Sequence, residues 1–85
     1  LDLRTACDVE ALRVKGIHSV LGGEADALVL PDIEVANVLY KALPLFASAQ
    51  VAGTLQGTLA PVVLPSRGDC ADAKYHSLAL AIMSC

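Results

Sequence analysis

Two stretches of the chain repeat their apolar residues with the period of an α-helix. Residues 33–48 predict an amphipathic helix, which Asp32 can cap and which Pro44 should kink or shorten. Residues 69–84 predict a second helix, whose later half is apolar all round and is expected to be buried on every side. The residues expected to face a core are Val35, Ala36, Leu39, Ala42, Leu43 and Phe46 in the first helix, and Ala71, Tyr75, Leu78 and Ile82 in the second.

Shorter segments precede and separate these helices. Residues 8–15 predict a short helix that Asp8 caps and Gly16 ends, and residues 17–25 predict a loop. Residues 27–30 form a continuous apolar run, the pattern of a strand buried on both faces of a sheet. Residues 50–55 and 61–64 predict two further strands. The order of helices and strands indicates the α/β class.

The composition suggests that part of the surface is normally covered. The chain has 85 residues, of which 55% are hydrophobic and 18% are charged. This apolar content excludes intrinsic disorder, and a small free-standing domain normally carries more charge. The longest uncharged run, residues 42–66, is broken by proline and glycine, so no membrane span is expected. We therefore expect a fragment of a larger protein or an obligate oligomer. The lack of an initial methionine and of a signal peptide agrees with a fragment or a processed chain.

Charge and cysteine usage exclude several other classes. The net charge is −3, and the six basic residues are scattered, so nucleic acid is not an expected partner. Cys7, Cys70 and Cys85 are odd in number and form no CxxC pair, which argues against a zinc site or a disulfide scaffold. Free thiols in a reducing cytosol, and no metal, are expected.

The segment PVVLPSRGD at residues 61–69 is the best candidate for chemistry. It predicts a strand followed by a turn at Ser66, Arg67 and Gly68 and then a helix, an arrangement that suits anions because helix N-termini present unpaired N–H groups. Ser66 would add a hydroxyl donor and Arg67 a two-pronged donor for phosphate or carboxylate. The alternative is purely structural, since Ser66 to Asp69 also matches a helix-capping pattern and Arg67 can be a solvated surface residue. From spacing alone, the structural alternative is the stronger.

Other candidate residues have a similar structural alternative. Asn37, Tyr40 and Lys41 can converge on one place at helical spacing, or can form the solvent face of an amphipathic helix. Neither His18 nor His76 has an identifiable acid–base partner, and Cys70 is expected to serve packing. No glycine-rich phosphate loop, GxSxG or HExxH motif occurs.

The chain resembles the C-terminal part of the phosphate acetyl/butyryltransferase family. The resemblance covers residues 22–43 and 51–81, and the ending SRGDCADAKYHSLALA is closer to the butyryl branch than to the acetyl branch. The matching elements, in family order, are Gly23, Ala25 and Asp26, then Pro31, Asp32, Asn37, Tyr40 and Lys41, then Gly57 and Pro61, and finally Ser66 and Arg67.

The resemblance implies a cytoplasmic enzyme with two α/β domains and an active-site cleft between them. The fold would be a three-layer αβα architecture similar to isocitrate and isopropylmalate dehydrogenases. Residues 1–49 would close an inserted second domain, and residues 50–85 would return to the first domain. A homo-oligomer is expected, and the fragment alone is expected to be inactive.

The implied reaction interconverts acyl-CoA and inorganic phosphate with acyl phosphate and CoA. CoA is a substrate in this scheme, and no bound cofactor is expected. By motif, Ser66 would hydrogen-bond the acyl oxygen and Arg67 would bind phosphate. Gly68, Asn37, Tyr40 and Lys41 would contribute to substrate binding or line the cleft.

One position departs from the acetyl branch of the family. That branch has a carboxylate, proposed as the base for the CoA thiol, about seven residues after the serine, where this chain has Ala73. Asp69 and Asp72 are neighbours that could replace it, although neither matches the motif.

Two alternatives to an enzyme remain open. The first is a non-catalytic, truncated relative that acts as an assembly or interaction module. The second is a nucleotide-binding α/β fragment, which the absence of a glycine-rich phosphate loop disfavours.

Overall fold

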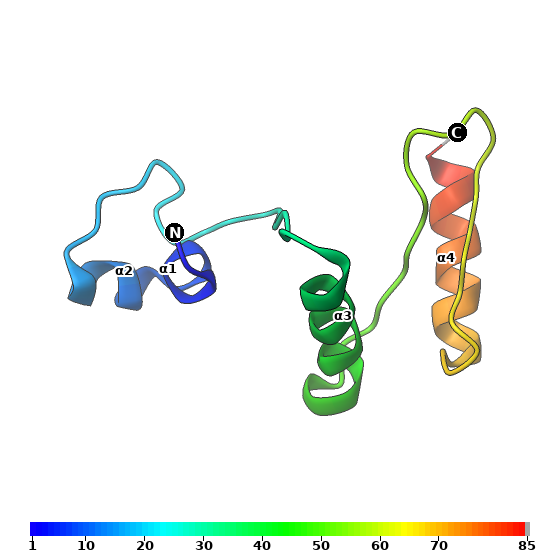
Figure 1. Cartoon of the computed structure of the whole chain (residues 1–85), viewed down its shortest axis with the longest axis horizontal. Helices are drawn as coiled ribbons and strands as arrows, with labels where there is room; N and C mark the ends of the chain where they lie inside the picture. Colours follow the sequence, from blue (N-terminus) through cyan, green and yellow to red (C-terminus); the bar gives the residue numbers. More distant parts are fainter. Residues whose placement is uncertain (85) are drawn as a thin grey trace. The chain divides into compact units, whose positions relative to one another are not determined.

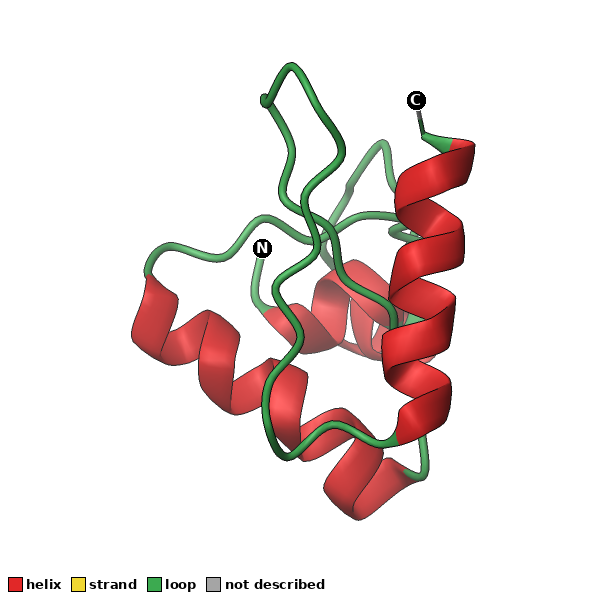
Figure 2. Cartoon of the chain, turned by 90° about the vertical axis from the view of Figure 1, so that its right-hand side faces the viewer, coloured by secondary structure: helices red, strands yellow, loops and turns green. Residues whose placement is uncertain are grey.

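A computed structural model describes residues 1–84, and within that range it contains helices joined by loops (Figures 1 and 2). The helices are α1 (Leu3–Cys7), α2 (Val9–Lys15), α3 (Ile33–Ala47) and α4 (Ala71–Met83). The chain divides into two compact units, of which the first comprises Leu1–Ile33 and the second begins at Glu34. Each unit is described by itself.

Helix α2 in the first unit forms where the sequence predicted it. The Asp8 carboxylate caps its start by accepting hydrogen bonds from the backbone N–H groups of Glu10 at 3.0 Å and Ala11 at 3.3 Å. Gly16 ends the helix in the left-handed conformation, with φ of 65°. Helix α1, which the sequence analysis did not predict, has only five residues.

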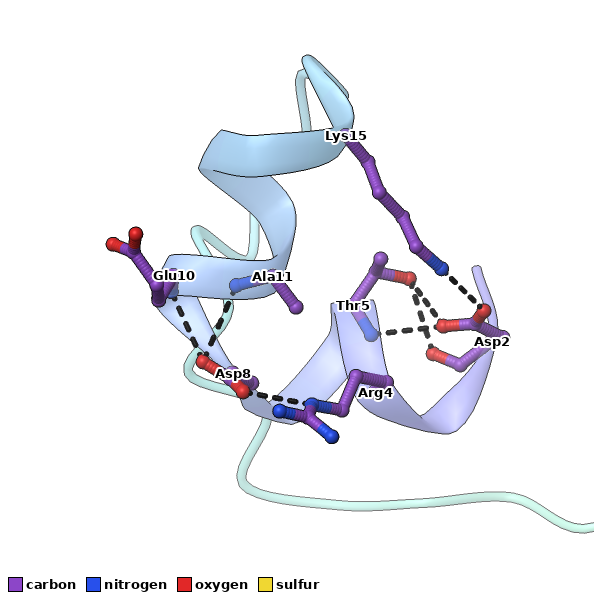
Figure 3. Close-up of polar contacts among 7 residues, drawn as sticks. All are labelled: Asp2, Arg4, Thr5, Asp8, Glu10, Ala11 and Lys15. Carbon is purple, nitrogen blue, oxygen red and sulfur yellow. Dashed lines mark hydrogen bonds and ion pairs between the residues drawn. The ribbon is translucent and has the colours of Figure 1, made fainter.

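Polar contacts of Asp2 explain why so short a helix as α1 forms (Figure 3). The Asp2 carboxylate accepts hydrogen bonds from the Thr5 backbone N–H and from the Thr5 hydroxyl, each at 2.8 Å. It also forms an ion pair of 3.1 Å with Lys15 of α2. The Thr5 bonds and then Lys15 hold the pKa of Asp2 well below its usual value. Asp8 is similar, because its hydrogen bond with Arg4 and the helix N–H groups lower its pKa. Each carboxylate therefore caps one helix and also pairs with a cation.

The loop between α2 and α3 packs closely on the start of α2. Gly23 is buried and has a positive φ of 79°, and a Cβ atom built there would lie 2.7 Å from the backbone Cα of Val9. The backbone N–H of Ala25 donates to the carbonyl of Ala6 at 3.0 Å. The loop predicted over residues 17–25 is confirmed, and the close approach explains why it carries glycine at position 23.

Helix α3 confirms the helix predicted at residues 33–48, but its apolar side does not reach a core. Pro44 lies inside the helix, which continues to Ala47. No residue of α3 is fully buried: Leu39 is half-buried, and Phe46, expected to face a core, is 82% exposed.

The expected strands are wrong for the described residues. The only bridge in residues 1–84 is a single antiparallel pair between Leu55 and Val62, in which the Leu55 N–H donates to the Val62 carbonyl at 3.0 Å. Residues 27–30 are not paired as a strand, and Val29 is 99% exposed instead of buried on both faces. Apolar extended backbone becomes a strand only when a neighbouring strand pairs with its N–H and C=O groups, and residues 1–84 supply no such neighbour here.

Helix α4 forms as predicted but buries a different face. Its buried residues are Ala73, Ser77 and Ala81, which repeat every four residues, whereas Tyr75, Leu78 and Ile82 of the predicted stripe are exposed. The second half of α4 is therefore not buried on every side. The Ser77 hydroxyl donates to the Ala73 carbonyl at 2.7 Å and accepts from the Gly53 N–H at 3.0 Å, which fastens the extended segment around residue 53 to α4.

Candidate functional site

The segment from Ser66 to Asp69 forms a tight turn directly before α4. The Asp69 carboxylate accepts a hydrogen bond of 3.0 Å from the Ser66 backbone N–H, and the Asp69 N–H donates to the Ser66 carbonyl at 3.1 Å. The Gly68 N–H lies 3.4 Å from the Ser66 hydroxyl oxygen, which accepts from it. Helix α4 itself begins later, with Cys70 as its N-cap and the Cys70 sulfur accepting from the Ala73 N–H at 3.4 Å.

Three N–H groups of the turn are engaged within it. Those of Ser66, Gly68 and Asp69 donate to the Asp69 carboxylate, the Ser66 hydroxyl and the Ser66 carbonyl, respectively. Gly68 therefore takes part in the turn's own hydrogen bonding. The Ser66 hydroxyl, which accepts one bond, still has its own O–H to donate to a ligand.

A cavity of about 650 Å³ lies beside this turn, within the second unit. Ser66, Gly68 and Asp69 contribute to its wall from the turn, Tyr40 and Lys41 from α3, and Asp72 from the first turn of α4. The other lining residues are Pro44, Leu45, Ser48, Ala49, Gln50, Val51, Cys70, Ala73 and His76. Six of the candidate residues are thus brought to one cavity.

Tyr40 and Asp69 lie in the same cavity wall, and both side chains are half-buried. Burial, followed by the negative charge of Asp69, raises the pKa of the Tyr40 hydroxyl. The cavity thus brings α3 close to the turn before α4, although the two elements lie far apart in the sequence.

Two candidate residues are not in the cavity wall. Arg67 and Asn37 are both exposed, and neither is among the residues that line the cavity. Asn37 therefore does not join Tyr40 and Lys41 there, although all three share one helix. Cys70 is exposed and caps α4, so the packing role expected for it is wrong.

Two residues shape this region although their sequence positions predicted no role for them here. His76 lines the cavity, and its ring lies 5.7 Å from that of Tyr75 in an edge-to-face arrangement. Ser77 is 5% exposed and holds Gly53 against α4. A polar residue at the centre of the Ala73–Ala81 repeat is the signal that identifies Ser77, because a polar side chain on a buried face needs a hydrogen-bond partner.

The described part of the chain shows neither a metal-binding cluster nor a membrane-spanning helix. Among residues 1–84, no three histidine, cysteine or acidic side chains are grouped so that they could hold a metal ion. In the same range, none of the helices has the length and apolar character needed to cross a bilayer.

A model of the family described as phosphate acetyl/butaryl transferase matches residues 1–82. The chain belongs to this family. It is 53% identical over 72 residues to a phosphate acetyltransferase of Thermotoga maritima, covering 85% of this chain and 24% of that protein. It is 46% identical over 81 residues to a phosphate butyryltransferase of Clostridium beijerinckii, covering 95% of this chain and 27% of that protein. The family resemblance inferred from the motifs is confirmed.

A solved structure of the family has a similar backbone. The crystal structure of a branched-chain phosphotransacylase from Enterococcus faecalis matches with a TM-score of 0.86 and 48% identity, covering 96% of this chain and 31% of that one. The chain thus spans about a quarter to a third of the length of these family members. Acetyl- and butyryltransferases both match, so the preference for the butyryl branch is not resolved.

Proposed function

We propose that the intact protein carrying this sequence is a phosphate acyltransferase that interconverts acyl-CoA and phosphate with acyl phosphate and CoA. The observation that carries the proposal is the turn that contains the family's serine–arginine pair. Its Ser66, Gly68 and Asp69 line one cavity together with Tyr40 and Lys41 of the family's second motif. Residues from two motifs that residues 42–65 separate in the sequence therefore line the same cavity.

In this proposal, the CoA thiolate attacks the carbonyl carbon of the acyl phosphate. The C–S bond forms, the C–O bond to phosphate breaks, and inorganic phosphate leaves. The Ser66 hydroxyl donates a hydrogen bond to the acyl oxygen as negative charge develops on it. The Arg67 guanidinium binds the phosphate oxygens through paired N–H donors. Since Arg67 is exposed and outside the cavity lining, its side chain would turn toward phosphate when substrate binds.

A proton acceptor is needed for the CoA thiol. Asp72 lies in the first turn of α4 and lines the cavity, next to the Ala73 position that departs from the acetyl branch. We propose Asp72 for this role, because its carboxylate is exposed and can be approached by a thiol.

The proposal includes a larger architecture around these residues. Residues 1–49 would belong to an inserted second domain and residues 50–85 to the first, within a three-layer αβα fold. The remainder of that fold, or a second copy in a homo-oligomer, would cover the exposed apolar side chains and supply strands to pair with residues 27–30. Such exposed side chains occur in both units, for example Val20, Val29, Phe46 and Leu59. The exposed apolar surface supports this part of the proposal.

Turnover of the intact protein tests the proposed function. We expect phosphate-dependent release of CoA from acyl-CoA by the protein expressed from the whole reading frame, and none from the 85 residues alone. Ser66→Ala and Arg67→Gln should each lower kcat by about a hundred- to thousand-fold without a matching loss of stability. Ser84→Ala, at the far end of α4, is the control. An intact protein without phosphate-dependent turnover contradicts the proposal.

The exposed apolar side chains of both units equally suit a non-catalytic assembly module. A stable oligomer of the intact protein that shows no binding of CoA would favour that second candidate. Equal losses of stability and turnover in the Ser66 and Arg67 variants would favour a purely structural turn.

A further inference from the structure

Asp69 was one of two candidate bases, but its contacts indicate a different role. Its carboxylate accepts the Ser66 backbone N–H at 3.0 Å, while its own N–H donates to the Ser66 carbonyl at 3.1 Å. These two bonds close a ring around Arg67 and Gly68. The conformation of the serine–arginine pair is therefore fixed from the aspartate side.

A second group lies near this carboxylate. Tyr40 of α3 is half-buried and lines the same cavity as Asp69, and the pKa of its hydroxyl is raised by burial and then by the negative charge of Asp69. The carboxylate is therefore held by the turn and lies beside α3 in the cavity wall. A carboxylate held in this way has less freedom to approach a substrate thiol than the exposed Asp72 has.

We infer that Asp69 is a positioning residue, which holds the Ser66–Arg67 turn in its conformation, and that it is not the proton acceptor of the reaction. The inference rests on the proposed function in so far as it concerns turnover. Its structural part, the dependence of the turn on the Asp69 acceptor, can be measured without turnover.

The geometry explains why this support matters for catalysis. Ser66 and Arg67 must place a hydroxyl and a guanidinium on different oxygens of the same substrate. A displacement of about 1 Å in such an arrangement can reduce the rate on the order of a hundred-fold. Without an acceptor at Asp69, the Ser66 N–H loses the bond that holds the Ser66 backbone in the turn.

The test compares Asp69→Asn with Asp69→Ala in the intact protein. Asparagine keeps an oxygen acceptor for the Ser66 N–H but cannot take a proton, whereas alanine offers neither. Glu34→Gln removes a carboxylate from the first turn of α3 and is the matched control, because Glu34 is exposed and outside the cavity lining. The measurements are kcat, KM for phosphate, the pH profile of kcat, and hydrogen exchange of the Ser66 amide.

We expect Asp69→Ala to lower kcat by about ten- to a hundred-fold and to speed exchange of the Ser66 amide. Asp69→Asn should stay within a few-fold of the wild type in both, with an unchanged pH profile. Tyr40→Phe should leave exchange of the Ser66 amide close to that of the wild type, because the Ser66 bond to Asp69 stays in place.

Several results would overturn the inference. If Asp69→Asn loses as much turnover as Asp69→Ala and loses the acidic side of its pH profile, Asp69 is the proton acceptor. If Asp69→Ala matches the wild type in kcat and in Ser66 exchange, Asp69 has no role. Should Asp69→Ala not fold, the exchange and pH profile of Asp69→Asn still decide. A wild type without turnover refutes the proposed function alone, since Ser66 exchange still tests the turn.

Discussion

Replacing Ser77 by alanine is expected to loosen the attachment of the segment around Gly53 to α4. The Ser77 hydroxyl makes two hydrogen bonds, and they differ in importance. The Ala73 carbonyl, which accepts at 2.7 Å, lies inside α4 and also has a helical N–H partner available. The Gly53 N–H, which donates at 3.0 Å, depends on the serine oxygen.

The expected cost follows from that second bond. A hydrogen bond of this kind contributes about 0.5 to 1.5 kcal/mol to stability. A donor left without a partner in a fully buried place costs about 1 to 3 kcal/mol, but Gly53 is exposed, so water can replace part of the bond. Alanine is also the better helix former, by about 0.5 kcal/mol or less. We therefore expect Ser77→Ala to lower the free energy of unfolding by at most about 1 kcal/mol, with the clearer effect on exchange of the Gly53 amide.

Ser84→Ala is the control for this measurement. The Ser84 hydroxyl also donates to a carbonyl four residues earlier, that of Leu80 at 2.7 Å, but it is exposed and follows the last residue of α4. Its replacement should change stability by less than about 0.5 kcal/mol. The assay is urea unfolding of the intact protein together with native-state hydrogen exchange of the Gly53 amide. Unchanged exchange at Gly53 in Ser77→Ala, with α4 intact, would refute the reasoning.

Three other perturbations test the rest of the molecule. Gly23→Ala should lower the free energy of unfolding by more than Gly22→Ala does. Both glycines have a left-handed backbone, which costs alanine about 1 to 2 kcal/mol, but of the two only Gly23 has the Val9 backbone 2.7 Å from where a Cβ would lie. Equal losses would contradict the close approach. The pKa of Asp2 is lowered from 3.8, so its contribution to stability is present above pH 3.8 and is lost as the pH falls further. In an acid titration followed by circular dichroism, Asp2→Asn should lack this loss of stability. The pKa of Tyr40 is raised above 10.0, so its contribution to stability is present below pH 10.0 and is lost as the pH rises through the pKa of the folded state. Tyr40→Phe should therefore show a weaker loss of stability at alkaline pH. An identical loss would argue against the influence of Asp69 on Tyr40.

The helices could be predicted because their signals are local. Asp8 and Gly16 lie directly at the two ends of α2, and capping needs only residues within one turn. Helix α1 was missed because five residues carry no periodic pattern. Its stability depends instead on Asp2 and on Lys15 from the next helix, a contact that spacing does not reveal.

The strands could not be predicted in the same way, because a strand is defined by its neighbour. Residues 27–30 have the composition of a buried strand, yet in residues 1–84 they pair with no other segment as a strand. The same reasoning applies to the faces of α4. Hydrophobicity favoured Tyr75, Leu78 and Ile82, but the segment around Gly53 packs where the small residues Ala73 and Ser77 let it come close.

The candidate site was predictable only in part of its residues and not in its bonds. Motif spacing identified Ser66, Tyr40 and Lys41, which line one cavity, but also Arg67 and Asn37, which do not line it. The sequence could not distinguish a capping turn from an anion site, and the geometry combines features of both. The turn satisfies N–H groups of its own, but Cys70 caps α4 in place of the Ser66 that the capping pattern indicated, and Ser66 remains at the cavity wall.

The charges around the cavity set a further condition on the proposed function. Lys41 is the one lysine or arginine among the lining residues, against the carboxylates of Asp69 and Asp72, so the wall is net negative when His76 is neutral. Phosphate is also negative, and like charges at short range disfavour binding even where water weakens them. Arg67 brings this sum only to zero, which gives no net attraction for phosphate. If these residues do bind phosphate, we therefore expect further cations to come from outside the 85 residues. Calorimetry should accordingly detect phosphate binding to the intact protein and none to the 85 residues alone, and equal affinities would show that Ser66, Arg67 and Lys41 suffice.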